Sequence, residues 1–384
     1  MNIAFEKPSL WQRVKPVLAG FDWPLLLIVL SLCTIGLGAM YSAGYDHGTR
    51  FIDQSRNMAL AAIVLFTVAQ IPPQRLMALA VPLYAMGIVL LLAVAAFGIT
   101  KKGATRWLNV GMVIQPSEML KIAMPLMLAW WFQRREGQLR GLDFVVAGML
   151  LALPVGLVMK QPDLGTSLLI LSGGLYVIFF AGLSWKLIVP VLMIGAAGIT
   201  AVVVSEERIC QPGLDWVVLH EYQKHRVCTL LDPTQDPLGK GFHIIQGMVA
   251  IGSGGISGKG FMKGTQTHLE FIPERTTDFV FAAYAEEFGL VGCLVLLFLF
   301  LCLIYRGLMI SAQAPTLFSR LLGGSISLSF FTYVFVNMGM VSGILPVVGV
   351  PLPFISYGGT AMVTLGLGLG ILMSIAKSRG LMQR

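Results

Sequence analysis

The stretch THLEFIPERTTDFVFAAYAEEFGLVGCLVLLFLFLCLI, residues 267–304, passes from a polar segment into one of the most apolar runs in the chain. From Phe279 onward it is long and apolar enough for a membrane helix, which needs about 20 predominantly apolar residues. Charged side chains crowd the start of that run: Glu270, Glu274, Arg275, Asp278, Glu286 and Glu287. The stretch therefore predicts a membrane span with acidic groups near its start. Carboxylates in this position need a structural or a functional reason.

The composition of the whole chain indicates the same environment. Of 384 residues, 56% are hydrophobic and only 12% are charged, whereas soluble domains carry about 25% charged residues. The mean hydropathy is +0.79. We therefore expect a membrane protein with many spans. The net charge of +8 is no evidence for a nucleic-acid partner, because short cytoplasmic loops of membrane proteins are rich in Lys and Arg.

The apolar runs predict an all-α polytopic membrane protein, a single domain over residues 1–384 with no soluble domain appended. We expect ten spans, and several of them contain Pro or Gly. The ninth is long enough to be tilted or kinked. The expected spans cover residues 24–43, 56–71, 76–98, 116–132, 143–160, 164–182, 187–205, 279–304, 316–344 and 360–376.

The distribution of Lys and Arg predicts the orientation, because basic loops stay in the cytoplasm. It places both termini inside, with residues 1–23 as a cytoplasmic tail and no cleavable signal. Residues 206–278 then form one long extracytoplasmic loop between spans seven and eight. Cys210 and Cys228 lie in this loop without CxxC spacing. A disulfide between them is compatible with an oxidising compartment, but the sequence leaves it open.

The first polar cluster near a span is KKGATRWLNVGMVIQPSEMLKIAMP, residues 101–125. Glu118 and Lys121 are three residues apart, so a helix places them on one face, where they can pair. One interpretation is a structural ion pair. The other is a cationic pocket, formed by Arg106 and Lys121, for a phosphate-bearing lipid headgroup.

Two further clusters combine polar residues with helix breaks. In MKQPDLGTS, residues 159–167, Asp163 either caps the helix that follows or helps to form a polar cavity near Lys160. In VGVPLPFISYGGTAM, residues 348–362, the Pro and Gly residues predict an irregular segment on the outer side. Because irregular backbone at membrane depth is tolerated where it lines a cavity, we expect Ser356 and Tyr357 to face one.

The glycine-rich part of residues 246–279 does not form a nucleotide-binding loop. A phosphate-binding loop of that class needs Gly where Ser253 stands, and Ser or Thr where Gly260 follows Lys259. Lys259 and Lys263 nevertheless suit a turn that meets an anion through backbone amides.

Asp278 follows this segment, at the expected membrane rim. Pro273 ends any earlier helix, and Thr276 or Thr277 is suited to cap the next one. One interpretation makes Asp278 itself the helix cap. The other makes it a carboxylate that accepts a proton from a hydroxyl, which is worth about 10²–10⁴-fold in rate. All four clusters are expected on the outer side, and their convergence favours the functional interpretation.

These motifs carry a resemblance over almost the whole chain. RWLNVGMVIQPSEMLKI, QPDLGTS, the run from LDPTQDPLGKG to AEEFGLVG, and GVPLPFISYGGT resemble the SEDS family (shape, elongation, division and sporulation). FIPERTTDF resembles its rod-shape-determining (RodA) branch, because the division branch typically has Ala where Arg275 stands. Thr276 departs from the His of close relatives.

The resemblance implies an inverting peptidoglycan glycosyltransferase that polymerises lipid II, with undecaprenyl pyrophosphate as the leaving group and Asp278 as the general base. The candidate substrate-binding residues are Arg106, Glu118, Lys121, Asp163, Lys263, Arg275 and Ser356. A divalent cation such as Mg²⁺ or Mn²⁺ is a candidate cofactor.

The resemblance also implies a class B penicillin-binding protein, a transpeptidase, as a membrane partner, together with other elongation-machinery proteins. It implies a bacterial inner-membrane location with the site facing the periplasm. A lipid II flippase and a scaffold for a transpeptidase are the alternatives. A flippase needs polar groups along its whole path, whereas the candidates here crowd the outer side, which favours an enzyme.

Overall fold

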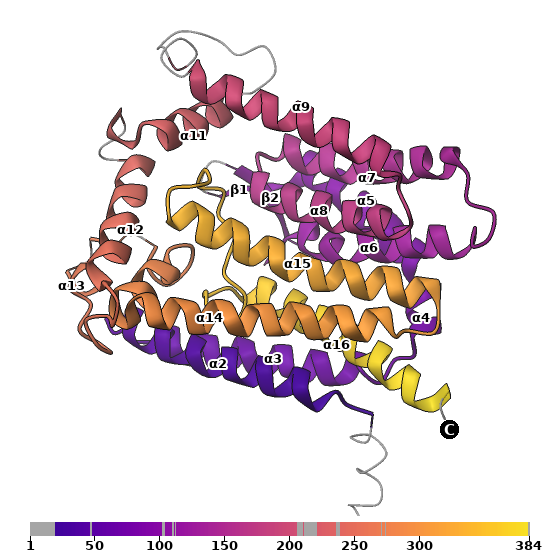
Figure 1. The fold of residues 1–384 in the computed structure, drawn as a ribbon, viewed down its shortest axis with the longest axis horizontal. Helices are drawn as coiled ribbons and strands as arrows, with labels where there is room; N and C mark the ends of the chain where they lie inside the picture. Colours follow the sequence, from indigo (N-terminus) through magenta and orange to yellow (C-terminus); the bar gives the residue numbers. More distant parts are fainter. Residues whose placement is uncertain are drawn as a thin grey trace, which may run out of the picture.

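A computed structural model of the chain describes residues 20–46, 48–101, 104–109, 111, 113–205, 210, 221–235, 239–269, 271–272 and 274–382. Most of the expected cytoplasmic tail, residues 1–23, lies outside the described residues, as do parts of the loop expected at 206–278. Within the described residues the regular structure is mostly α-helical (Figure 1). This confirms the predicted fold class.

The helices of the first half are α2 (Trp23–Ala43), α3 (Arg50–Val68), α4 (Pro73–Ala78), α5 (Ala80–Phe97), α6 (Pro116–Gln133), α7 (Gly141–Lys160), α8 (Leu164–Phe180) and α9 (Trp185–Val204). Those of the second half are α11 (Glu221–Leu231), a 3₁₀ turn η1 (Pro233–Gln235), α12 (Lys240–Gly254), α13 (Thr265–His268), α14 (Val280–Ala312), α15 (Leu317–Val341) and α16 (Gly359–Met382).

Seven helices among the described residues are long and apolar enough to cross a membrane: α2, α5, α7, α9, α14, α15 and α16. They match seven of the ten expected spans. The other three expected spans correspond to α3, to α6, which carries Glu118 and Lys121, and to the shorter α8. The count of ten therefore stays a prediction. The helix that departs most from its expected bounds is α14, which continues to Ala312 and is interrupted at Gly289.

A small antiparallel sheet lies between α5 and α6 and was not predicted. Its strands are β1 (Ile99–Lys101), β2 (Ala104–Asn109) and β3 (Val113–Ile114), in the order β1-β2-β3. Ile99 pairs with Trp107, and Leu108 pairs with Ile114. The β-branched and aromatic residues of this stretch suit strands. The sheet fixes the position of Arg106, which lies on β2.

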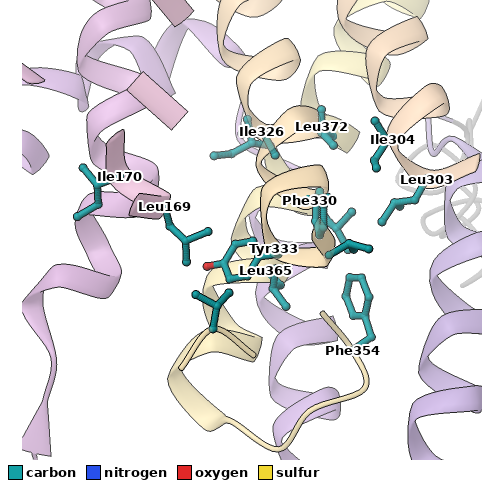
Figure 2. Packing of buried hydrophobic residues seen from close by; sticks show 14 of the residues in the cluster. Leu169, Ile170, Leu303, Ile304, Ile326, Phe330, Tyr333, Phe354, Leu365 and Leu372 are labelled. Atoms are coloured by element: carbon teal, nitrogen blue, oxygen red, sulfur yellow. The ribbon is translucent and has the colours of Figure 1, made fainter. Parts of the chain in front are cut away.

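Small residues let helices approach closely, as is common in membranes. A Cβ at Gly366 of α16 would lie 2.5 Å from the carbonyl oxygen of Ala61 on α3. Large side chains fill the centre of the bundle, where Figure 2 shows Phe330 of α15 facing Phe354. These two rings stack with centroids 6.0 Å apart. This contact ties the irregular segment after α15 to the helix bundle.

The irregular elements gather at one end of the long helices. Figure 1 shows α12 and α13 beside the start of α14, α11 between α12 and the end of α9, and the C-terminus at the opposite end of the long helices. α12 packs against α14, where a Cβ at Gly247 would lie 3.2 Å from the ring of Phe279. At the opposite end, Arg306 Nη2 pairs with Asp22 Oδ2 at 2.6 Å, next to the start of α2. Asp278 thus lies at the end that carries the helices of the long loop.

Candidate active site around Asp278

Asp278 lies in a turn immediately before α14 and is half-buried. The residue at the cap position of α14 is Phe279, whose own side chain makes no capping hydrogen bond. The interpretation of Asp278 as a helix cap is therefore wrong, and so is the expectation that Thr276 or Thr277 caps this helix. Phe279, and not Asp278, therefore occupies the cap position of α14.

Side-chain donors hold the backbone of Asp278 in place. Asn337, on α15, is completely buried. Its Nδ2 donates to the carbonyl oxygen of Asp278 at 3.0 Å and to that of Val350 at 2.8 Å. One buried amide thus joins the turn that carries Asp278 to the irregular segment between α15 and α16.

The two residues before Asp278 are held by the same irregular segment. Ser356 Oγ donates to the carbonyl oxygen of Thr277 at 2.6 Å and accepts from the backbone N–H of Leu352 at 2.8 Å. The backbone N–H of Tyr357 donates to the carbonyl oxygen of Thr276 at 2.9 Å. Three consecutive carbonyls, those of residues 276–278, therefore accept hydrogen bonds from residues of this segment or of α15, and the turn is fixed along its length.

The segment around Gly349 lies directly beside the carboxylate. A Cβ on Gly349, whose φ is +75°, would lie 3.3 Å from Asp278 Oδ2. On its other side, a Cβ on Gly165 of α8 would lie 2.8 Å from the carbonyl oxygen of Val348. Residues 348–349 thus lie close both to Asp278 and to the start of α8, and the motifs QPDLGTS and GVPLP meet here.

Asp163 and Arg106 lie together, a pairing that the sequence did not predict. Asp163 caps α8 by accepting from the backbone N–H of Thr166 at 3.1 Å, and its Oδ2 accepts from Gln115 Nε2 at 3.0 Å. Arg106 Nη1 lies 3.6 Å from Asp163 Oδ1. The capping interpretation of Asp163 is confirmed, and the charge that pairs with it is Arg106, whereas Lys160 is exposed.

Glu118 and Lys121 form the predicted ion pair, with Lys121 Nζ 2.6 Å from Glu118 Oε1. Only 7% of Lys121 is exposed, and its Nζ lies 5.5 Å from the ring centroid of Tyr333. The adjacent cavity, lined also by Thr364, is about 30 Å³, which suits a water or two. Figure 2 shows Tyr333 lying near Leu169 and Leu365 at this place. The cavity is far below the roughly 300–1,000 Å³ of a ligand pocket.

Two predicted binding residues have their polar atoms occupied by the protein itself. Arg275 is 6% exposed. Its Nε donates to Ala43 at 2.9 Å, its Nη1 to Thr267 at 3.0 Å, and its Nη2 to Asp46. Ser356 is 2% exposed, so the expectation that its hydroxyl faces a cavity is wrong. A sequence does not distinguish a structural polar residue from a substrate-binding one, because the amino-acid type does not show whether its hydrogen-bond partner is the protein backbone or the substrate.

Lys263 has a different environment, because its side chain is exposed. The neighbouring Lys259 is instead engaged, with its Nζ 2.6 Å from Oε1 of the fully buried Glu286. Glu286 also accepts from the backbone N–H groups of Gln266, at 2.8 Å, and Thr267, at 3.1 Å. These contacts explain one of the acidic residues within residues 267–304, since Glu286 anchors the loop to α14.

A break in α14 accommodates the same loop. Gly289 has a φ of +63° inside the helix. Across the break, the backbone N–H of Leu290 donates to the carbonyl oxygen of Gly255 at 2.9 Å. The backbone N–H of Lys259 donates to the carbonyl oxygen of Glu286 at 3.1 Å. Glu287 accepts from Ser42 of α2. Sequence reasoning missed these anchors, although a charge in an apolar run signals that it needs a partner.

Cys210 and Cys228 form a disulfide, which the sequence had left open. Among the described residues, no group of three or more His, Cys, Asp and Glu side chains is arranged to hold a metal ion. The side chains of this part of the chain thus form no such preformed cluster, and a divalent cation stays a prediction from the resemblance.

Comparison with known proteins places these features in context. The sequence model of the FtsW/RodA/SpoVE family, described as a cell cycle protein, matches residues 23–380. Peptidoglycan glycosyltransferase MrdB of Escherichia coli (strain K12) is 47% identical over 99% of this chain and 98% of its own length. Stage V sporulation protein E of Bacillus subtilis (strain 168) is 31% identical over 93% of this chain and 97% of its own length.

Solved structures show the same similarity. A chain from a peptidoglycan synthase complex, in which polymerization and crosslinking are coordinated, has a TM-score of 0.76 and 32% identity, and the match covers 94% of this chain and 98% of that one. The rod shape determining protein RodA of Thermus thermophilus has a TM-score of 0.68 and 28% identity, over 94% of this chain and 97% of that one.

Proposed function

Because the chain belongs to the FtsW/RodA/SpoVE family and is a peptidoglycan glycosyltransferase, we propose that it polymerises lipid II into glycan strands with Asp278 as the general base. Lipid II is a disaccharide-pentapeptide on undecaprenyl pyrophosphate. The 4-hydroxyl of the acceptor sugar attacks the anomeric carbon of the donor, and its proton passes to the Asp278 carboxylate. The bond from that carbon to the phosphate oxygen breaks, and undecaprenyl pyrophosphate leaves with the electron pair.

A single displacement of this kind inverts the anomeric centre and needs one base and no protein nucleophile. The observation that carries the proposal is the way in which the backbone at Asp278 is held. Three consecutive carbonyls accept hydrogen bonds from Asn337, Ser356 and Tyr357. A base must be positioned to within a fraction of an ångström, because small misplacements of reacting groups cost large factors in rate.

The leaving pyrophosphate needs cationic partners. We propose Arg106, whose side chain is 26% exposed, and the exposed Lys263 for this role. Lys121 is buried against Glu118 in a small cavity, so that pair contacts substrate only if the cavity opens. Asp163 orients Arg106. Arg275 and Ser356 are not among the proposed substrate contacts, because they are only 6% and 2% exposed. Arg106 also donates within the protein, from Nε to the carbonyl oxygen of Gln161 at 3.4 Å, but its side chain is more open.

We further propose that the enzyme is a single multi-pass domain in the bacterial inner membrane, with Asp278 facing the periplasm. The Cys210–Cys228 disulfide lies in the long loop that precedes Asp278 and supports this side, because disulfides persist in oxidising compartments. The likeness to a chain from a peptidoglycan synthase complex supports a class B penicillin-binding protein as partner, alongside other proteins of the elongation machinery.

The test uses purified protein and lipid II, comparing wild type with Asp278→Asn. The matched control is Asp53→Asn, which neutralises a half-buried carboxylate on α3 that pairs with Arg56 of the same helix. We expect glycan polymer from wild type and from the control, and a loss of at least about 10²-fold for Asp278→Asn. Polymer from Asp278→Asn at the wild-type rate contradicts the assignment of the base.

The same variants distinguish the alternatives. A flippase would move lipid II across proteoliposome membranes, and Asp278→Asn would still do so. A scaffold would bind the transpeptidase but make no glycan, alone or in the complex.

A further inference from the structure

Helix α11 contacts the segment that lies beside the Asp278 carboxylate. Arg226 of α11 donates from Nη1 to the carbonyl oxygen of Val347 at 3.1 Å. Two residues further on, a Cβ on Gly349 would lie 3.3 Å from Asp278 Oδ2. The segment Val347–Val350 therefore connects an arginine of the long loop to the catalytic carboxylate.

This segment is held from two sides. Arg226 bonds its first carbonyl, and Asn337 bonds the carbonyl of Val350 at 2.8 Å. It has neither helical nor strand structure, so side-chain donors take the place of a regular hydrogen-bond pattern. A hydrogen bond from an ionised guanidinium is stronger than one between neutral groups. The Arg226 contact is thus suited to fix the outer end of the segment.

A disulfide fixes α11 in turn. Cys228 lies two residues after Arg226 on α11 and is bonded to Cys210, 18 residues earlier in the chain. Beyond this bond, α11 packs mainly against η1 and α12. A crosslink of this kind restricts the positions open to the helix. Arg226 therefore lies two residues from a covalent crosslink that reductants can break.

We propose that Arg226 is a positioning residue for Asp278, and that the Cys210–Cys228 disulfide holds α11 where Arg226 reaches Val347. Arg226 does not touch substrate. It keeps the Val347–Val350 segment against the carboxylate, so its loss affects the chemical step more than substrate binding. This inference rests on the proposed role of Asp278 as the base.

The first experiment measures initial polymerisation rates over a range of lipid II concentrations. Arg226→Ala should lower kcat by about 10–100-fold, since a displaced base costs factors of this size, while KM changes less than about threefold. Lys186→Ala, which removes an exposed positive charge on α9, is the control for the loss of a positive charge and should keep kcat within about threefold. Arg226→Lys, which keeps a charged donor, should fall between wild type and Arg226→Ala.

The second experiment breaks the disulfide. Dithiothreitol supplies the two electrons and two protons that convert it to two thiols, and is itself oxidised to a cyclic disulfide. Reduction should lower kcat of the wild-type enzyme, as the Arg226→Ala substitution does. The double variant Cys210→Ser/Cys228→Ser should have a low kcat that the reductant does not change. If reduction and the Arg226→Ala substitution both act through the contact between Arg226 and Val347, reduction should lower kcat of Arg226→Ala only slightly further.

Hydrogen–deuterium exchange gives a readout independent of turnover. Exchange at Val348 and Gly349 should become faster in Arg226→Ala and should not change in Lys186→Ala, with α14 and α15 protected in both variants. Unchanged kcat in Arg226→Ala overturns the inference, and so does a raised KM with unchanged kcat, which would make Arg226 a substrate contact. Polymer formation by Asp278→Asn is a different failure, that of the proposed function itself.

Discussion

Asn337 and Asp278 are 59 residues apart, and the buried amide of the first donates to the backbone carbonyl of the second at 3.0 Å. The same nitrogen donates to Val350 at 2.8 Å. An aspartate carboxylate has no hydrogen to donate, so Asn337→Asp removes both bonds with almost no change of shape.

We expect Asn337→Asp and Asn337→Ala to lower the polymerisation rate by about tenfold or more, because each leaves two buried carbonyls without this donor. Ser342→Ala, which removes a hydroxyl that bonds only to its own helix, serves as the control. Equal rates for Asn337→Ala and wild type, measured with purified protein and lipid II, contradict a positioning role for this amide.

Gly349→Ala tests how tightly the irregular segment packs against the carboxylate. The φ of +75° at Gly349 costs a residue with a Cβ about 1–2 kcal/mol, and the new methyl would lie 3.3 Å from Asp278 Oδ2. We expect lower activity together with a small loss of thermal stability. Gly358→Ala is the matched control, because a Cβ there meets its nearest neighbour only at 3.6 Å. If both variants polymerise equally well, the segment does not constrain Asp278.

The anchor between the loop and α14 predicts a change in stability. Lys259→Met would leave the fully buried Glu286 without its cation, and breaking a buried pair in this way typically costs about 3–5 kcal/mol. The double variant Lys259→Met/Glu286→Gln should be more stable than Lys259→Met, since it leaves no uncompensated charge. Thermal unfolding in detergent measures both, with the exposed Lys263→Met as control. A double variant no more stable than Lys259→Met would show that the pair carries no coupling energy.

The fold was predictable where the sequence carries a long local signal. Apolar runs predict helices such as α2 and α7 to within a few residues, because a membrane span needs one continuous apolar stretch. The break at Gly289 was not predictable, since VFAAYAEEFGLVG reads as an uninterrupted helix. The break depends on the backbone of Gly255 and Lys259 approaching across it, and no local pattern encodes that approach.

The site was predictable only in part, for a related reason. Asp278 was proposed from its motif and from its position at the start of a span. The pairing of Arg106 with Asp163 was not predicted, since the sequence suggested Lys121 as the neighbour of Arg106 and Lys160 as that of Asp163. Arg275 was assigned to substrate, whereas its guanidinium bonds to Ala43, 232 residues away in the chain. Contacts between residues so far apart in the chain depend on how the helices pack, and they cannot be inferred from a single sequence.

The proposed orientation predicts which residues a membrane-impermeant thiol reagent can reach. Lys263 is exposed in the loop before Asp278, and Gln138 is exposed between α6 and α7. In a background in which the three free cysteines, Cys33, Cys293 and Cys302, are replaced by Ala, a maleimide should label Lys263→Cys in intact spheroplasts. It should label Gln138→Cys only after the membrane is permeabilised.

The reverse labelling pattern would place Asp278 in the cytoplasm. Lipid II polymerisation on the periplasmic side would then be excluded, even if the purified enzyme made glycan in detergent. Labelling of both variants before permeabilisation would indicate leaky spheroplasts, so a cytoplasmic marker protein with a reactive cysteine is followed in the same sample. Labelling confined to Lys263→Cys, with that marker unlabelled, would support a base on the outer side, where an extracytoplasmic disulfide persists.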